Sequence, residues 1–120
     1  MKNRLILVML LLSHFAYTQV LVNEVNINEL KDVKYIQLLA TQKGFSTKIV
    51  ISVDYGQPRK LFKSQRIKGL EGKNKAFNSV IDALNFMEKN GWAYVNSYVA
   101  TESGSNEYHY LLKRKEEKKK

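Results

Sequence analysis

The stretch AFNSVIDALNFMEKNGW, residues 76–92, decides the fold because it holds the clearest helical pattern in the chain. Its larger apolar side chains recur at three- and four-residue steps, so a helix places them on one face. These residues are Phe77, Val80, Ile81, Leu84 and Met87. Asn90 and Gly91 follow, and glycine accepts the left-handed backbone that ends many helices. We therefore predict a helix over residues 76–89 with one apolar face.

Two details concern the start and the far side of this helix. Ser79, with Asp82 three residues later, suits a cap on the first turn, although the helix can also start nearer Lys75. Phe86 is expected to project from the side opposite the apolar face. It marks either a partner contact or one of the single exposed aromatic residues that are common on protein surfaces.

Two segments before the helix alternate between apolar and other side chains and are rich in β-branched residues. They cover residues 33–41 and 48–55, and this pattern is typical of half-buried strands. Residues 42–46 between them contain a glycine and suit a hairpin connection. Residues 20–27 are a weaker candidate for an edge strand because they are more polar.

Two further strands are predicted after the helix, over residues 92–100 and 108–114. The first alternates Trp, Tyr, Asn and Tyr with Ala, Val, Ser and Val, and the second alternates in the same way. The polar residues 102–106, which include a glycine, suit the hairpin loop between them. The order strand, strand, helix, strand, strand predicts an α+β fold, a four-stranded antiparallel sheet with one helix packed on one face.

The alternation assigns the side chains to two faces of this sheet. The helix is expected to cover the apolar set, which is Ile36, Leu38, Ile49, Ile51, Val53, Val95, Val99 and Leu111. The open face then carries rings and amides, which suit stacking on sugars or bases, or a protein contact. The predicted ligand-binding residues are Tyr35, Tyr94, Asn96, Tyr98 and Tyr110, beside Gln37. Alternatively, the tyrosines only brace their cross-strand neighbours, or the faces are reversed and the rings lie in the core. Trp92 is the least certain, since the helix end can fold over it.

The first eighteen residues have the layout of a secretory signal peptide. Lys2 and Arg4 precede an apolar run over residues 5–12, and Ala16 and Thr18 supply small side chains before the cleavage point. A membrane-spanning helix needs about 20 apolar residues, which this run does not reach. We therefore predict that residues 1–18 are removed and that the protein is exported to the periplasm or the exterior. A retained membrane anchor is the alternative.

The remaining chain is basic, and its charge is uneven. Loss of the signal lowers the formal net charge from +9 to +7. Much of this charge lies in residues 59–75 and in residues 113–120, which we predict to be a basic tail after a single domain of residues 19–112. Such clusters attract polyanions, and the predicted contacts are Arg59, Lys60, Lys63, Arg66 and Lys68. The alternative is a solvated surface that only keeps the protein soluble.

No catalytic, metal or cofactor site is predicted. The chain has no Cys, and His109 is the one histidine after the signal, whereas a zinc site built on imidazole needs several ligands. Asp54, Tyr55, Gly56 and Gln57 place an acid, a phenol and an amide together at a strand end. They either line a pocket or terminate the strand, with Gly56 allowing the turn.

Several short motifs together carry a resemblance. They are Phe77-Asn78-Ser79, Ala83-Leu84-Asn85-Phe86-Met87, Gly91-Trp92, Tyr98, Tyr108-His109-Tyr110-Leu111-Leu112-Lys113, Asn28-Glu29-Leu30, Tyr35-Ile36 and Asp54-Tyr55-Gly56-Gln57. With these motifs, the chain resembles a group of small exported bacterial proteins of unknown function. It is similar, more loosely, to small uncharacterised bacterial domains in which a helix ends in Gly-Trp and runs into a hairpin. The resemblance covers residues 27–115 and implies the fold and the export, but it transfers no activity, ligand or catalytic residue.

The sequence therefore favours an exported, non-enzymatic binding or interaction module whose ligand it does not name. The expected partner is an unknown protein or an envelope polymer, and nucleic acid is disfavoured. A membrane is expected to be reached only through an uncleaved signal or the peripheral basic tail. One alternative is a structural envelope protein that rests its basic loop and tail on anionic surfaces. The other is an enzyme with a carboxylate site near Asp54.

Overall fold

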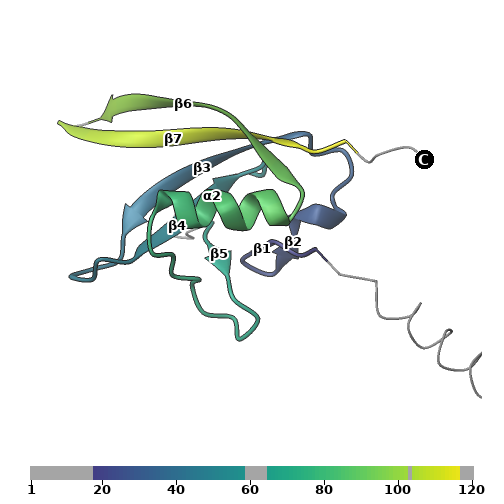
Figure 1. The fold of residues 1–120 in the computed structure, drawn as a ribbon, viewed down its shortest axis with the longest axis horizontal. Coiled ribbons are helices and arrows are strands. Elements are labelled where there is room, and N and C mark those ends of the chain that lie inside the picture. The colour runs from purple at the N-terminus through teal and green to yellow at the C-terminus, as the bar shows by residue number, and fades with distance from the viewer. Residues whose placement is uncertain (1–17, 59–64, 103, 117–120) are drawn as a thin grey trace, which may run out of the picture.

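The computed structural model describes residues 18–58, 65–102 and 104–116, so most of the predicted signal peptide and residues 117–120 lie outside it. The described chain is an α+β fold of mostly antiparallel strands with one α-helix (Figure 1). Its elements are β1 (Leu21–Val22), β2 (Val25–Asn26), the 3-10 turn η2 (Ile27–Glu29), β3 (Tyr35–Gln42), β4 (Ile49–Asp54), β5 (Ile67–Lys68), α2 (Val80–Lys89), β6 (Trp92–Glu102) and β7 (Ser105–Arg114). Among the described residues, no helix combines the length and the apolar character that a membrane crossing requires.

The strands form two sheets, so the prediction of a single four-stranded sheet is wrong. The larger sheet has four strands in the order β4-β3-β7-β6, and these correspond to the four predicted strands. The smaller sheet has the order β2-β1-β5, and each of its strands is only two residues long. Residues 20–27, the weaker edge-strand candidate, contain β1 and β2, but two residues are too few to show a period-two pattern, and the sequence did not indicate β5 or a second sheet.

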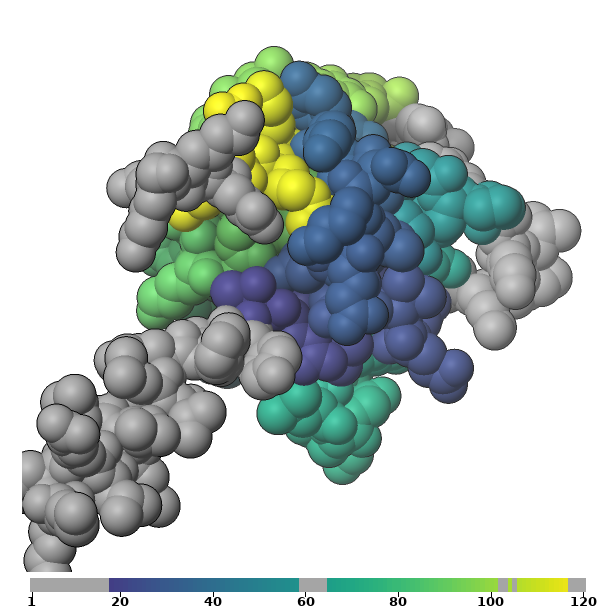
Figure 2. Space-filling model, turned by 90° about the vertical axis from the view of Figure 1, so that its right-hand side faces the viewer, coloured from purple at the N-terminus to yellow at the C-terminus, as the bar shows by residue number. Residues whose placement is uncertain are grey.

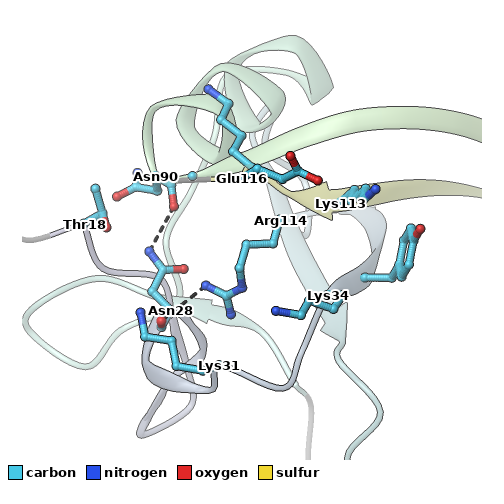
Figure 3. A pocket seen from close by; sticks show the side chains of 11 residues that line it. Thr18, Asn28, Lys31, Lys34, Asn90, Lys113, Arg114 and Glu116 are labelled. Carbon is cyan, nitrogen blue, oxygen red and sulfur yellow. Dashed lines mark hydrogen bonds between the residues drawn. The ribbon is translucent and has the colours of Figure 1, made fainter. Parts of the chain in front are cut away.

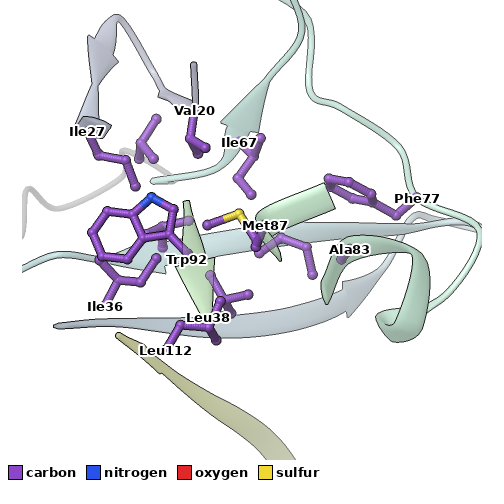
Figure 4. Packing of buried hydrophobic residues seen from close by; sticks show 13 residues of the cluster. Val20, Ile27, Ile36, Leu38, Ile67, Phe77, Ala83, Met87, Trp92 and Leu112 are labelled. Atoms are coloured by element: carbon purple, nitrogen blue, oxygen red, sulfur yellow. The ribbon is translucent and has the colours of Figure 1, made fainter. Parts of the chain in front are cut away.

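Helix α2 packs on one face of the large sheet, and the small sheet and η2 close the core beside it (Figure 1). The buried cluster consists of Val20, Val22, Ile27, Ile36, Leu38, Ile51, Val53, Ile67, Phe77, Ala83, Met87, Trp92 and Leu112. Figure 4 shows Met87 of α2 within this cluster. Each large side chain buried in this way contributes about 1.5–3 kcal/mol of transfer free energy, so this cluster is the main source of stability.

Helix α2 begins at Val80 and not at residue 76, because Phe77 lies in an extended segment. Phe77 and Ile49 exchange two backbone hydrogen bonds, of 2.9 and 2.8 Å, along the outer edge of β4. The predicted cap is confirmed, since Ser79 Oγ accepts from the backbone N–H of Asp82 at 3.2 Å. The helix therefore starts where its cap allows and not where its apolar pattern starts.

The buried face of the helix also differs from the predicted one. Ile81 was expected to face the core but is 64% exposed, whereas Ala83 and Met87 are fully buried. Phe86 was expected to project away, but it is partly buried and its ring meets that of Phe77 edge-on, with centroids 5.5 Å apart. The difference arises because the extended segment before the helix brings Phe77 to the side of α2 where Phe86 lies.

An irregularity in β6 changes which of its side chains share a face. Tyr94 pairs with Leu112, but Asn96 pairs with the adjacent residue Leu111, so Val95 is an extra residue on β6. A β-bulge of this kind interrupts the alternation of side chains between the two faces. The side chains of Trp92 and Tyr94 therefore lie on the core side of the sheet, while those of Asn96 and Tyr98 lie on the reverse side.

Candidate anion-binding site

The tyrosines predicted to share the open face of the sheet lie on different faces. Residues directly opposite each other in an antiparallel pair share a face. Tyr110 lies opposite the buried Leu38 and packs against the core, and Tyr94 also lies on the core side, before the bulge. Tyr35, Asn96 and Tyr98 lie on the reverse side, as predicted. The prediction of one continuous tyrosine face is therefore wrong for Tyr94 and Tyr110.

On the reverse face, the aromatic side chains support one another across three strands. The rings of Tyr98 and His109 stack with centroids 5.0 Å apart and planes 7° apart. Gln37 Nε2 donates to the Tyr98 hydroxyl, and His109 Nε2 lies 3.4 Å from Glu107 Oε2. These contacts join β3, β6 and β7, which is the cross-strand bracing that the sequence left as the alternative to ligand binding.

The predicted polyanion contacts are only partly described. Arg59, Lys60 and Lys63 lie outside the described residues. Lys68 belongs to β5, and its Nζ donates to Asn74 Oδ1 at 2.6 Å. Arg66 bridges to Ser52 beside β4, and its Nε is buried without a hydrogen-bond partner in the described part of the chain. The described part of this segment thus contributes strand pairing to the fold, and its polyanion role stays a prediction.

The group around Asp54 closes a turn at the end of β4. Asp54 Oδ1 accepts from the backbone N–H of Gly56 at 2.9 Å. Gln57 Oε1 accepts from the Tyr55 N–H at 2.7 Å, and Gln57 Nε2 donates to the Val53 carbonyl at 2.9 Å. Gly56 has a φ of +92°, a backbone conformation that glycine adopts without strain. The side chains of Asp54 and Gln57 therefore serve to end the strand.

A basic pocket of about 1320 Å³ opens at the end of the large sheet where β7 finishes and β6 begins. Figure 2 faces this end, with the last residues of β7 in yellow beside the blue residues around the start of β3. Its charged lining residues are Lys31, Lys34, Lys113, Arg114, Lys115 and Glu116. Five cations thus surround one carboxylate, so the pocket attracts negatively charged groups.

The backbone around the end of β7 fixes the shape of this pocket. The Arg114 N–H donates to the Lys34 carbonyl at 2.8 Å, and the Lys115 N–H donates to the Gly91 carbonyl at 2.9 Å. Gly91 has a φ of +92°, which lets the chain turn directly from α2 into β6. The end of β7 is therefore held between the segment before β3 and the helix terminus.

The Arg114 side chain ties the pocket to the N-terminal part of the domain. Its guanidinium donates to four backbone carbonyls, at 2.9 Å to Val33, 3.1 Å to Ile27, 3.3 Å to Asn28 and 2.9 Å to Leu30. Four of its five N–H groups are used in this way. Its Cζ also lies 4.5 Å from the centroid of a ring in Trp92. Arg114 thus has a structural role at this site.

A buried amide links Trp92 to the same region. Trp92 Nε1 donates to Asn28 Oδ1 at 2.7 Å, and Asn28 Nδ2 donates to the Asn90 carbonyl at 2.9 Å. Asn28 is the one buried polar side chain among the described residues, with 8% of its surface exposed. Because both ends of its amide are paired, the burial of this polar group is offset by its hydrogen bonds. Asn28 therefore connects Trp92 to the end of α2 beside the pocket.

The lysines differ in how much of their charge is available to a ligand. Lys115 is engaged, because its Nζ donates to the Glu88 carbonyl at 2.8 Å and pairs with the Glu88 carboxylate. Lys113 Nζ lies 5.8 Å from the centroid of the Tyr35 ring. Lys31 and Lys34 are exposed and have no hydrogen-bond or ion-pair partner in the described part of the chain. Figure 3 shows both of them around the guanidinium of Arg114.

Of the residues predicted to bind a ligand, Tyr35 alone lines this pocket. Arg114 was assigned both to the end of a strand and to the basic tail, and the structure places it and Lys113 in β7. Its carbonyl partners lie 81 to 87 positions earlier in the chain. No local pattern connects residues so far apart, so sequence reasoning missed the site. The one available signal was a group of cations at the end of a predicted strand.

The comparisons with known proteins add nothing to this picture. No family model matches the chain, and neither does any curated protein or solved structure. The resemblance to small exported bacterial proteins stays a prediction.

Proposed function

We propose that the protein is an exported, non-enzymatic binding module whose basic pocket holds anionic groups of an envelope polymer. The observation that carries the proposal is the pair Lys31 and Lys34, two exposed cations that have no partner among the described residues and that line a pocket with three further cations. Here Arg114 has the structural role, which leaves the lysines to meet a ligand.

The form of the pocket favours an extended ligand over a small ion. Ligand pockets for compact molecules have volumes of about 300–1,000 Å³, and this pocket is larger and open to solvent. Lysine ammonium groups act as point charges that tolerate variable ligand geometry. A polymer with repeated carboxylate or phosphate groups can meet several of them at once, and the exposed ring of Tyr35 at the rim offers a surface for a sugar.

Removal of the signal would change the pocket edge. Thr18 lines the pocket, and the backbone N–H of Gln19 donates to Asn90 Oδ1 at 3.2 Å. Cleavage after Thr18 would remove one lining residue and leave a new amino group beside the pocket. Binding is therefore best measured on residues 19–120, the expected mature chain.

The test compares two double variants with the same change in charge. Lys31→Ala with Lys34→Ala removes two exposed cations of the pocket that have no partner among the described residues, and Lys43→Ala with Lys73→Ala removes two exposed lysines from loops elsewhere. Isothermal titration with polygalacturonate and, separately, with long-chain polyphosphate separates carboxylate from phosphate ligands. We expect the pocket variant to weaken the preferred polymer about tenfold and the control to change it little. Equal losses in both variants would mean that binding follows net charge alone and would overturn the proposal.

A shortened chain tests the alternative in which the tail holds the protein on anionic surfaces. A variant that ends at Glu116 keeps the whole pocket and loses residues 117–120. The proposal predicts that this variant binds the polymer with nearly unchanged affinity. Complete loss of binding would favour the tail and the envelope-structural alternative.

A further inference from the structure

The two edges of the large sheet differ in how they are covered. Along the outer edge of β4, Ile49 exchanges two backbone hydrogen bonds with Phe77, and the Val53 N–H donates to the Gln65 carbonyl at 2.7 Å. The other edge strand is β6. In the described part of the chain, no backbone hydrogen bond reaches β6 from any segment other than β7. An edge strand with free N–H and C=O groups is a template for pairing with another strand.

Most of β6 lacks the charged residues and proline that usually protect such an edge. Proteins commonly place proline or charged residues, especially lysine, on exposed edge strands. Residues 92–101 contain none of these, although the chain has 20 Lys and Arg residues. The large side chains Tyr94, Val95, Tyr98 and Val99 are all about half exposed. The bulge at Val95 interrupts only the first part of the strand, and residues 96–102 pair regularly with β7.

We propose that β6 pairs antiparallel with β6 of a second copy of this chain, in a symmetric dimer centred on Val99. In this register, Val99 of one copy lies opposite Val99 of the other. Val99 also lies opposite Tyr108 on β7, and these two side chains are 52% and 53% exposed. Pairing therefore places Tyr108, Val99, Val99 and Tyr108 in one row across four strands, and this apolar row is removed from water.

Charge also favours a second copy as the occupant. Residues 92–101 of β6 carry no charge and Glu102 ends the strand, so the centres of two such strands come together without like-charge repulsion, although each mature chain has a net charge of +7. β6 starts at the pocket end, and Val99 lies seven positions after Trp92, or about 23 Å along the strand. Antiparallel pairing therefore places the two basic pockets at opposite ends of an eight-stranded sheet, much further apart than the distance over which salt screens charge.

The dimer has a consequence for ligand binding that depends on the proposed function. Two pockets on one particle can engage the same polymer, and the second contact forms at a raised effective concentration. The pairing itself does not depend on any ligand. Dimerisation and anion binding can therefore fail separately.

Sedimentation equilibrium of residues 19–120 over a range of concentrations tests the pairing directly. Val99→Lys places two cations opposite each other at the centre of the interface, and we expect the dimer dissociation constant to rise at least about tenfold. The control is Ile81→Lys, an equal change at an exposed position of α2, which should leave the dimer intact. A wild-type protein that stays monomeric at every concentration, or equal dimerisation of both variants, would overturn the proposal.

A cysteine variant supplies a second test that does not require a lysine on the strand. The natural chain has no Cys, so a single introduced thiol can form a disulfide only between copies. Opposed residues of antiparallel strands have Cα atoms about 4.5–5.5 Å apart, within the range that a disulfide accepts. Val99→Cys should oxidise quickly to a covalent dimer, and Ile81→Cys should not. Equal rates of cross-linking at the two positions would contradict the dimer.

Discussion

The two ends of the β6–β7 hairpin differ in what their side chains contact, although the same antiparallel backbone pairing runs along both. At the pocket end, Trp92 is buried and Arg114 binds four carbonyls from the N-terminal segment. At the far end, Val99 and Tyr108 lie opposite each other and both are about half exposed. The pocket end of the hairpin therefore fixes the fold and supports the pocket. The far end, which carries the loop, contributes little to the core and is available to contact another molecule. Substitutions near the pocket end should therefore lower the free energy of unfolding more than substitutions near the far end.

The largest effect is expected at Arg114. Arg114→Ala leaves four carbonyls without their donor and removes the contact with Trp92. Because hydrogen bonds from a charged donor are strong, we expect the free energy of unfolding to fall by about 3 kcal/mol. Urea denaturation followed by circular dichroism measures this loss.

The matched control is Lys113→Ala, the adjacent and exposed residue of β7. Its effect on the free energy of unfolding should stay within about 0.5 kcal/mol. Similar losses in the two variants would show that Arg114 is an ordinary surface cation and would remove the difference between the two ends.

A smaller loss is expected when the indole of Trp92 is replaced. Trp92→Phe keeps an aromatic ring but leaves Asn28 Oδ1 buried without its donor. A buried acceptor without a partner costs about 1–3 kcal/mol, so urea denaturation should show a loss in that range. Tyr94→Phe is the control, since its hydroxyl contacts Ser97 on the exposed surface and its loss should change stability little. A loss from Tyr94→Phe as large as that from Trp92→Phe would contradict the account.

At the far half of the hairpin, Tyr98→Ala should lower stability only slightly. The substitution removes the stack with His109 and the hydrogen bond from Gln37, both on an exposed face. Cross-strand pairs of this kind are worth about 0.2–1 kcal/mol, so the variant should remain folded by circular dichroism. If Tyr98→Ala unfolds the domain at room temperature, the reverse face is part of the core and the gradient along the hairpin does not exist.

The smallest effect on stability is expected from the pocket lysines. Lys31→Ala with Lys34→Ala removes two exposed cations that have no partner in the described part of the chain. The free energy of unfolding should change by less than about 0.5 kcal/mol, even though the affinity for the anionic polymer falls. A large loss of stability would mean that these lysines stabilise the fold, and they would then no longer support ligand binding at the pocket.

The elements with long repeating patterns could be predicted from the sequence. The α+β class, helix α2 with its Ser79 cap, and the four strands of the large sheet all follow from local periodicity. The start of α2 could not, because Phe77 is held extended by pairing with Ile49, and the apolar pattern does not record that pairing. The two-residue strands of the small sheet are too short to leave a pattern.

The candidate site was harder to predict than the fold because distant contacts create it. The bulge at Val95 moves Tyr94 to the core side and divides the expected tyrosine face, and a single extra residue leaves no clear mark in the sequence. The pocket depends on Arg114 reaching residues more than 80 positions away. Charge clustering did indicate basic surfaces, but the described structure gathers free cations at Lys31 and Lys34, outside both predicted clusters.

The central claim is that an anionic polymer binds at the pocket end of the hairpin and does not contact the far end. A nuclear magnetic resonance titration of residues 19–120 with polyphosphate tests this claim residue by residue. We predict that the amide signals of Lys31, Lys34 and Lys113 shift, while those of Val99 and Tyr108 stay in place. Shifts confined to residues 66–68 would contradict the claim, and so would shifts of equal size at both ends of the hairpin.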